Sequence, residues 1–276
     1  MRVTLRHTTR LEYDGDVVES VMDARLGPRS DEDQRWGRFE LRTSPVAAVR
    51  RYADAFGNIG HLISVAGPHD HLEVTTVGEV ETLLLDPFAL PRTSPEPLEA
   101  GALADYLHPS RLIPGDEGLL TLAHPHRPAS ADGAFGAAGA LMHLVYAEFL
   151  YRADMTTVAT TVPELLATRT GVCQDLAHVL VGLCRAIQIP ARYVSGYIVT
   201  GADGPKRGGG HSHAWAEAWS AAYGWRGFDP TNDLLASEHH VKMAVGRDYR
   251  DVPPTQGTFR GAAEERLAVE VVARAA

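Results

Sequence analysis

Residues 170–178 read TGVCQDLAH, and they open the segment around which the rest of the chain is organised. Gly171 ends the preceding segment, and Pro190 prevents a helix from continuing beyond it. Between these two points apolar residues recur in steps of three and four, at Leu176, Val179, Leu180, Leu183, Cys184 and Ile187. This spacing is typical of an amphipathic helix with one buried face. The sequence therefore predicts a helix whose first turn contains Cys173.

Cys173 lies where a nucleophilic thiol is favoured. In the first turn of a helix, unpaired backbone N–H groups and the positive end of the helix dipole favour a thiolate over a thiol. The same N–H groups can hold the oxyanion that forms when a thiolate attacks a carbonyl. Free cysteine is also commonly a small buried hydrophobe, so this position alone leaves a structural role open.

A second block predicts a β-hairpin. Residues 211–219 read HSHAWAEAW, where small residues alternate with large ones as in a strand with two different faces. A break containing Gly224 follows, and then a short strand at residues 225–229, WRGFD, which Pro230 ends. Two such strands joined by about five residues that include glycine form a hairpin.

The register of this hairpin brings a histidine and a carboxylate together. If Trp219 and Trp225 oppose each other across the turn, His213 lies opposite Thr231, or opposite Asp229 after a slip of one bulge. Cross-strand Cβ atoms are roughly 4.5–5.5 Å apart, so a hydrogen bond between His213 and Asp229 is feasible. A carboxylate on one imidazole nitrogen fixes the tautomer and leaves the other nitrogen to accept a thiol proton.

At these blocks the chain resembles bacterial transglutaminase-like proteins of the papain-like superfamily, which carry cysteine, histidine and aspartate in this order. The resemblance rests on GVCQD at 171–175, SHAW at 212–215 and GFDPTN at 227–232, with flanking blocks at 106–111, 192–197 and 246–254 and an N-terminal region around 52–58. It implies that Cys173 is the nucleophile, His213 the base and Asp229 the residue that orients the base.

The fold class expected is α+β. A papain-like transglutaminase core, with a helix packed on an antiparallel sheet, is preceded by a β-rich, sandwich-like N-terminal domain. Alternating segments such as 3–13 and 71–80 place this N-terminal domain at residues 1–85, and a linker with four prolines follows at 86–98. The catalytic domain is expected at 99–276, with residues 266–274 as its closing strand.

Composition excludes several classes of function. The chain has 276 residues, a net charge of −9, 45% hydrophobic and 22% charged residues, and it has no basic stripe, so we expect no nucleic-acid partner. It has no apolar run of about 18 residues, so no membrane span is expected.

Cys173 and Cys184 lie about 16 Å apart on one helix, too far for a disulfide. Together with the absence of a secretory h-region near the N-terminus, this favours a cytoplasmic location. Oligomeric state is left open.

Other candidate residues are supported less directly. Gln174 follows the nucleophile, and Trp215 and Tyr197 lie on strands that could border the cleft, so we expect these three to contact substrate. Glu217 is interpreted as either a salt-bridged strand residue or a cleft carboxylate. Residues 201–210 (GADGPKRGGG) predict a mobile flap over the site, because the glycine run lacks the ending of a phosphate-binding loop. Zinc-type C-x2-C or H-x3–5-H spacing is missing around these residues, so no metal and no cofactor are expected.

The chemistry expected is acyl transfer at an amide through a thioester on Cys173. Water resolves the thioester in a peptidase or amidase, and an amine resolves it in a transglutaminase. Hydrolysis of a peptide or protein amide is the preferred interpretation, because no feature indicates a dedicated lysine-amine site. A non-catalytic binding module on the same fold and arylamine-type acetyl transfer are the alternatives.

Overall fold

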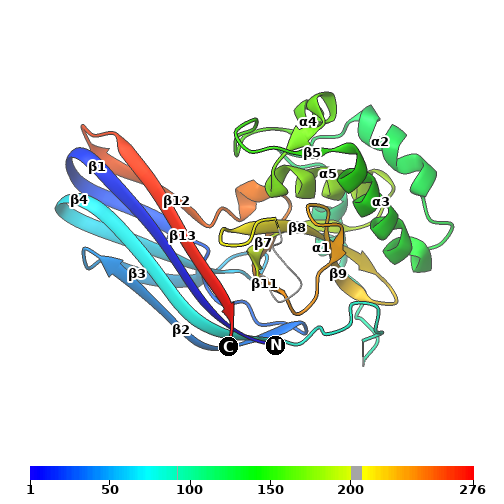
Figure 1. Cartoon of the computed structure of the whole chain (residues 1–276), viewed down its shortest axis with the longest axis horizontal. Helices are drawn as coiled ribbons and strands as arrows, with labels where there is room; N and C mark the ends of the chain where they lie inside the picture. The colour runs from blue at the N-terminus through cyan, green and yellow to red at the C-terminus, as the bar shows by residue number, and fades with distance from the viewer. Residues whose placement is uncertain (92, 200–206) are drawn as a thin grey trace.

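The structure is a computed structural model that describes residues 1–91, 93–199 and 207–276. Six antiparallel strands build an N-terminal sheet that lies apart from the helices (Figure 1). They are β1 (Arg2–Ala24), β2 (Gln34–Ser44), β3 (Ala48–Ala53), β4 (Ile59–Thr82), β12 (Thr255–Gly261) and β13 (Glu265–Ala275).

Two long strands, β1 and β4, give this sheet its sandwich-like shape. The first part of β1 pairs with β13 and its second part with β12, and irregularities near Val17 separate the two parts. Likewise β4 pairs first with β3 and then with β2. Leu11 and Leu72 from one half share a core with Met22 and Ile63 from the other. The two layers of the expected sandwich-like domain are therefore halves of one continuous sheet.

The C-terminal strand belongs to this N-terminal sheet. We expected residues 266–274 to close the catalytic domain, but β13 pairs with β1 from Val3 opposite Ala275 to Tyr13 opposite Glu265. Alternation along a strand indicates which side chains face a core, but it does not identify the neighbouring strand. Both termini consequently lie side by side (Figure 1), and the backbone N–H of Ala276 donates to Arg2 at 2.9 Å.

The remaining chain builds a five-stranded antiparallel sheet in the order β10-β9-β8-β7-β11. Its strands are β7 (Ala191–Ile198), β8 (His213–Ser220), β9 (Gly224–Asp229), β10 (Leu234–Leu235) and β11 (His240–Gly246). The α-helices are α1 (Ala100–Leu107), α2 (Glu117–Ala123), α3 (Ala134–Glu148), α4 (Val162–Thr168) and α5 (Cys173–Ala186). Short 3-10 turns lie at His124–His126, Ala131–Gly133 and Tyr249–Asp251, and β5 (Leu150–Tyr151) pairs with β6 (Thr170–Gly171). Helices α2–α5 lie on the side of this sheet away from the N-terminal sheet (Figure 1).

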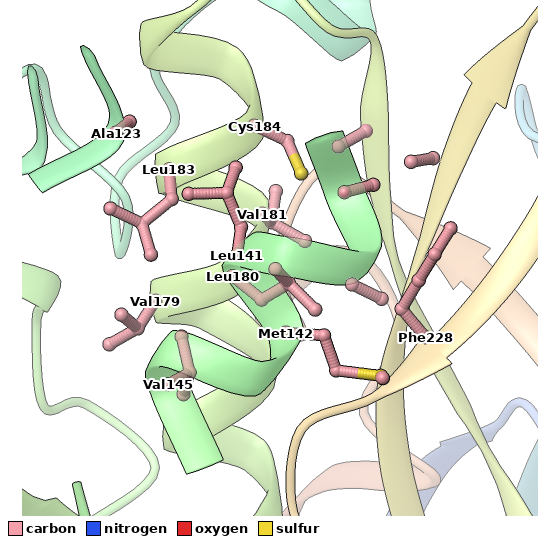
Figure 2. Packing of buried hydrophobic residues seen from close by; sticks show 14 of the residues in the cluster. Ala123, Leu141, Met142, Val145, Val179, Leu180, Val181, Leu183, Cys184 and Phe228 are labelled. Atoms are coloured by element: carbon pink, nitrogen blue, oxygen red, sulfur yellow. The ribbon is translucent and has the colours of Figure 1, made fainter. Parts of the chain in front are cut away.

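Helix α5 is the centre of the helical layer, as its apolar spacing predicted. Figure 2 shows α5 packed against α3, which in turn contacts β9, while α5 itself also lies against β8 and β7. The labelled side chains of this cluster include Leu141, Met142, Val145, Val179, Leu180, Leu183, Cys184 and Phe228. Cys184 is 1% exposed, and this burial raises the pKa of its thiol to about 12. A thiol in such surroundings is chemically inert. Of the helices in the described part of the chain, none has the length and apolar character needed to cross a bilayer.

Two buried amide side chains attach the N-terminal domain to the free edge of β11. Gln34 donates from Nε2 to Lys242 O at 2.6 Å and accepts from Lys242 N at 2.9 Å. Asn58 makes the same pair of bonds with Val245, both at 2.8 Å. Each amide thus replaces one residue of a missing neighbouring strand and satisfies the backbone groups of Lys242 or Val245 at this sheet edge.

A buried charge network crosses the same interface. Lys242 Nζ lies 2.6 Å from Glu217 on β8 and 2.9 Å from Asp31 of the N-terminal domain. Arg192 on β7 also lies 2.6 Å from Glu217. Burial acts to raise the pKa of Glu217, but the two cations lower it to about 2, so the carboxylate is ionised. Glu217 is therefore the salt-bridged strand residue of the two interpretations above.

Candidate active site

The hairpin β8–β9 places His213 beside Asp229. Trp219 pairs with Trp225 across the turn, so the predicted register is confirmed. His213 Nε2 lies 2.8 Å from Asp229 Oδ2, and both side chains are fully buried. The carboxylate and the imidazole therefore form the hydrogen-bonded pair that the register made feasible.

Local hydrogen bonds explain why Cys173 begins a helix. The Asp175 carboxylate turns back and accepts from the backbone N–H of Val172 at 2.9 Å and from Thr156 Oγ1 at 2.6 Å. This satisfies a donor that the helix itself leaves unpaired. A side chain at Gly171 would overlap the Asp175 carboxylate, so glycine is required by close approach. The first turn of α5, which carries the half-buried Cys173, is fixed in this way.

The thiol of Cys173 faces the imidazole of His213. Burial by itself lowers the pKa of His213, but Asp229, and after it Cys173, raise this pKa to about 10. The Nδ1 atom of His213 has no hydrogen bond of good geometry to any described residue. Hydrogen bonds between catalytic groups are often long or poorly aligned before substrate binds. Burial acts to raise the pKa of Asp229, but the charge of His213 and several hydrogen bonds hold it well below its usual range. The imidazole is thus protonated at neutral pH, beside an ionised carboxylate.

Asp229 has hydrogen-bond partners that the sequence did not indicate. Its Oδ1 accepts from the backbone N–H of Thr231 at 2.9 Å and of Asn232 at 3.3 Å. Its Oδ2 also accepts from Asn232 Nδ2 at 2.8 Å and lies 3.3 Å from His240 Nε2. Asn232 follows so closely in the chain that a turn could have been inferred, but no local pattern distinguishes His240 from its neighbour His239.

The segment before β8 covers the imidazole. A side chain at Gly208, whose φ is +88°, would overlap His213 Nδ1. Asn232 holds this segment, because its Oδ1 accepts from Arg207 N at 2.9 Å and its Nδ2 lies 3.2 Å from Arg207 O. Of the flap predicted at 201–210, residues 201–206 lie outside the described residues.

Comparison with known proteins places this geometry in a family. Residues 124–230 match the model of the transglutaminase-like superfamily, and residues 3–81 match that of the bacterial transglutaminase-like N-terminal region. An uncharacterised protein of Mycobacterium leprae is 32% identical over 282 residues, covering 98% of each chain. The chain belongs to the transglutaminase-like superfamily.

Other relatives differ in how far they extend. A Mycobacterium tuberculosis protein, also uncharacterised, is 31% identical and covers 93% of this chain and 87% of its own length. A protein-glutamine gamma-glutamyltransferase of Pseudomonas aeruginosa is 31% identical over 110 residues, which is 35% of this chain and 16% of that protein. Among solved structures, a candidate cysteine protease from Cytophaga hutchinsonii has a TM-score of 0.77 at 23% identity, over 99% of this chain and 90% of that one. This last likeness concerns the fold.

Two of the three expected substrate contacts are buried in this transglutaminase-like core. Trp215 is 1% exposed and packs beneath His213, with ring centroids 6.1 Å apart. Tyr197 is 3% exposed, and its hydroxyl forms a hydrogen bond of 2.8 Å with Nδ1 of His7 in the N-terminal domain. Neither ring is available to a substrate, so both expectations are corrected. Gln174 is partly exposed in the first turn of α5, beside the nucleophile.

One group of described residues could be considered for a metal ion. Ligand atoms of His213, Asp229 and His240 lie within 4.8 Å of one another. Their separations of 2.8 Å and 3.3 Å are those of hydrogen bonds, and Asp229 is already satisfied by neighbouring N–H groups. The donor set is thus accounted for by hydrogen bonding, and we assign no metal to it.

Proposed function

We propose that this protein is a cysteine-dependent enzyme that hydrolyses peptide or protein amide bonds through a thioester intermediate. The observation that carries the proposal is the buried 2.8 Å bond between His213 and Asp229, with the Cys173 thiol at a helix start facing the same imidazole. A structural cysteine has no need of an oriented imidazole and a buried carboxylate behind it.

Each residue has a defined role in this chemistry. The Cys173 thiolate attacks the amide carbonyl, a C–S bond forms, and the N–H groups of the first turn of α5 hold the oxyanion. His213 gives a proton to the leaving amine as the C–N bond breaks, which leaves a thioester and a neutral imidazole. Water then attacks the thioester and gives its proton to His213, and the product acid leaves as the thiolate returns. Asp229 stabilises the imidazolium whenever His213 carries the second proton, and it keeps the ring oriented in the thioester state.

Transamidation is the second candidate, and the matched segment of the Pseudomonas aeruginosa protein-glutamine gamma-glutamyltransferase favours it. That likeness covers 35% of this chain. Which product forms depends on which nucleophile, water or an amine, reaches the thioester. We favour water, because it is present at far higher concentration than any amine unless an amine is specifically bound. We further propose a reducing, cytoplasmic setting, supported by two free cysteines. Immunoblotting of cell fractions would test this location.

The test is turnover of a library of peptide amides, with and without a primary amine such as monodansylcadaverine. We expect release of amine or ammonia with a free acid as product, at the same rate when monodansylcadaverine is present. Cys173→Ala should abolish the release, and the matched control Cys184→Ala should retain it. Covalent incorporation of monodansylcadaverine as the main product would establish transamidation instead. Binding of peptides without turnover would establish a binding module.

A further inference from the structure

We propose that His240 is a positioning residue of this site: its neutral imidazole donates from Nε2 to Asp229 and fixes the carboxylate that orients His213. The inference builds on the proposed function, because it takes Asp229 as the partner of a working His213. Nothing in the sequence motifs or the family match singles out His240, which lies beyond the matched residues 124–230.

The geometry places two imidazoles on one carboxylate oxygen. His240 is the first residue of β11 and pairs with Ile198 of β7. Its side chain is 3% exposed, and its Nε2 lies 3.3 Å from Asp229 Oδ2, the atom that His213 Nε2 approaches at 2.8 Å. Asn232 Nδ2 donates to the same Oδ2 at 2.8 Å, so three donors surround this oxygen. A carboxylate oxygen accepts more than one hydrogen bond, so the contacts of both imidazoles can form together.

A turn that precedes β11 determines which nitrogen of His240 carries the proton. The backbone N–H of Ser237 points at His240 Nδ1 from 3.3 Å, and the backbone N–H of His240 donates to Ser237 O at 2.9 Å. A nitrogen that accepts from an N–H carries no proton, so the single proton of the neutral ring is on Nε2. A doubly protonated ring would direct Nδ1–H against the N–H of Ser237. His240 is therefore a neutral donor to Asp229 and not a second cation beside His213.

Packing connects the two rings to each other. The indole of Trp215 contacts His240 edge to face, with centroids 5.2 Å apart at 74°, and lies 6.1 Å from His213. One fully buried indole thus borders both imidazoles. Such surroundings restrict ring rotation, because a closely packed interior leaves few alternative rotamers.

The strand that carries His240 is aligned by the N-terminal domain. The Gln34 side chain is hydrogen-bonded to the backbone of Lys242, two residues after His240. The Asn58 side chain is hydrogen-bonded to the backbone of Val245. The N-terminal domain therefore contributes to the geometry of Asp229 through β11, without supplying a group to the site itself.

Two replacements of His240 separate positioning from space filling. In His240→Gln the side-chain amide nitrogen can occupy the place of Nε2 and still donate, whereas His240→Leu fills the space without a donor. Loss of a hydrogen bond to a charged group corresponds to about a 10–100-fold loss of rate when it acts mainly in the transition state. We expect His240→Leu to lower the rate at which iodoacetamide alkylates Cys173 at pH 6.5 by at least about tenfold. His240→Gln should stay within about threefold of the wild type. His143→Leu, on an exposed ring, is the matched control and should leave the rate unchanged.

Nitrogen-15 NMR of histidine-labelled wild-type protein tests the same inference without any variant. We expect one buried histidine, assigned to His240 by its loss in His240→Gln, to remain the neutral Nε2–H tautomer between pH 6 and 8. A charged ring, an Nδ1–H tautomer, or equal alkylation rates in His240→Leu and the wild type would overturn the proposal. So would a His240→Gln rate as low as that of His240→Leu. These readouts need no substrate. An unreactive Cys173 in the wild type would refute the proposed function instead.

Discussion

Replacing Gln34 with leucine tests how the N-terminal domain supports the active-site sheet. The side chain is 1% exposed and makes three hydrogen bonds: to Lys242 O and Arg29 O at 2.6 Å each, and from Lys242 N at 2.9 Å. Leucine has a similar size but no polar atoms, so three backbone groups would lose their partners. At about 1 kcal/mol or more for each such group, the free energy of unfolding should fall by about 3 kcal/mol. For a chain of this size that corresponds to a decrease in the unfolding temperature of roughly 6–12 °C.

Thermal unfolding followed by circular dichroism measures this change. Gln256→Leu, the same substitution at an exposed position of β12, is the control and should alter the free energy of unfolding by less than about 0.5 kcal/mol. We also expect Gln34→Leu to slow the alkylation of Cys173, because Lys242 shares β11 with His240. If Gln34→Leu unfolds at the same temperature as Gln256→Leu, the amide does not hold the edge of β11 and the reasoning is wrong.

Three further outcomes follow from the site. Asp229→Asn should retain the fold, as judged by circular dichroism, yet lower turnover by roughly 10²–10⁴-fold, because an amide does not stabilise the His213 imidazolium; turnover within a factor of three would contradict this. The pKa of His213 is raised to about 10 from 6.5, so its contribution to stability is complete below pH 6.5 and is lost as the pH rises towards 10. The free energy of unfolding measured with urea should thus decrease by up to about 1.4 kcal/mol per pH unit between pH 7 and 9, and part of this decrease should be missing in His213→Ala. Dialysis against EDTA should change neither the unfolding temperature nor turnover, and a loss restored by zinc would show that His213, Asp229 and His240 hold a metal.

Short-range patterns in the sequence were sufficient for the elements that carry the proposed triad. The spacing of Leu176, Val179 and Leu180 predicted α5, and the alternation around His213 with Trp219 and Trp225 predicted the hairpin and its register. These predictions succeeded because side-chain periodicity within one segment reports which face is buried, and a tight hairpin fixes the pairing of its own strands.

Contacts between distant segments were beyond such patterns. Gln34 and Lys242 are 208 residues apart, and an amide that completes a sheet edge leaves no periodic signal in the sequence. The same limit applies to β13, whose alternation was detected but whose partner β1 was not. Trp215 and Tyr197 were expected at the cleft because strand phase alone does not indicate whether a face meets solvent or another domain. Tyr197 meets His7.

The most direct measurement of the central claim is the site and rate of iodoacetamide labelling, mapped by mass spectrometry. The account predicts that Cys173 is alkylated while the buried Cys184 is not, and that His213→Ala slows labelling of Cys173 at pH 6.5 by at least about tenfold, since the imidazolium no longer stabilises the thiolate. Preferential labelling of Cys184, or a rate at Cys173 that is the same with and without His213, would contradict it.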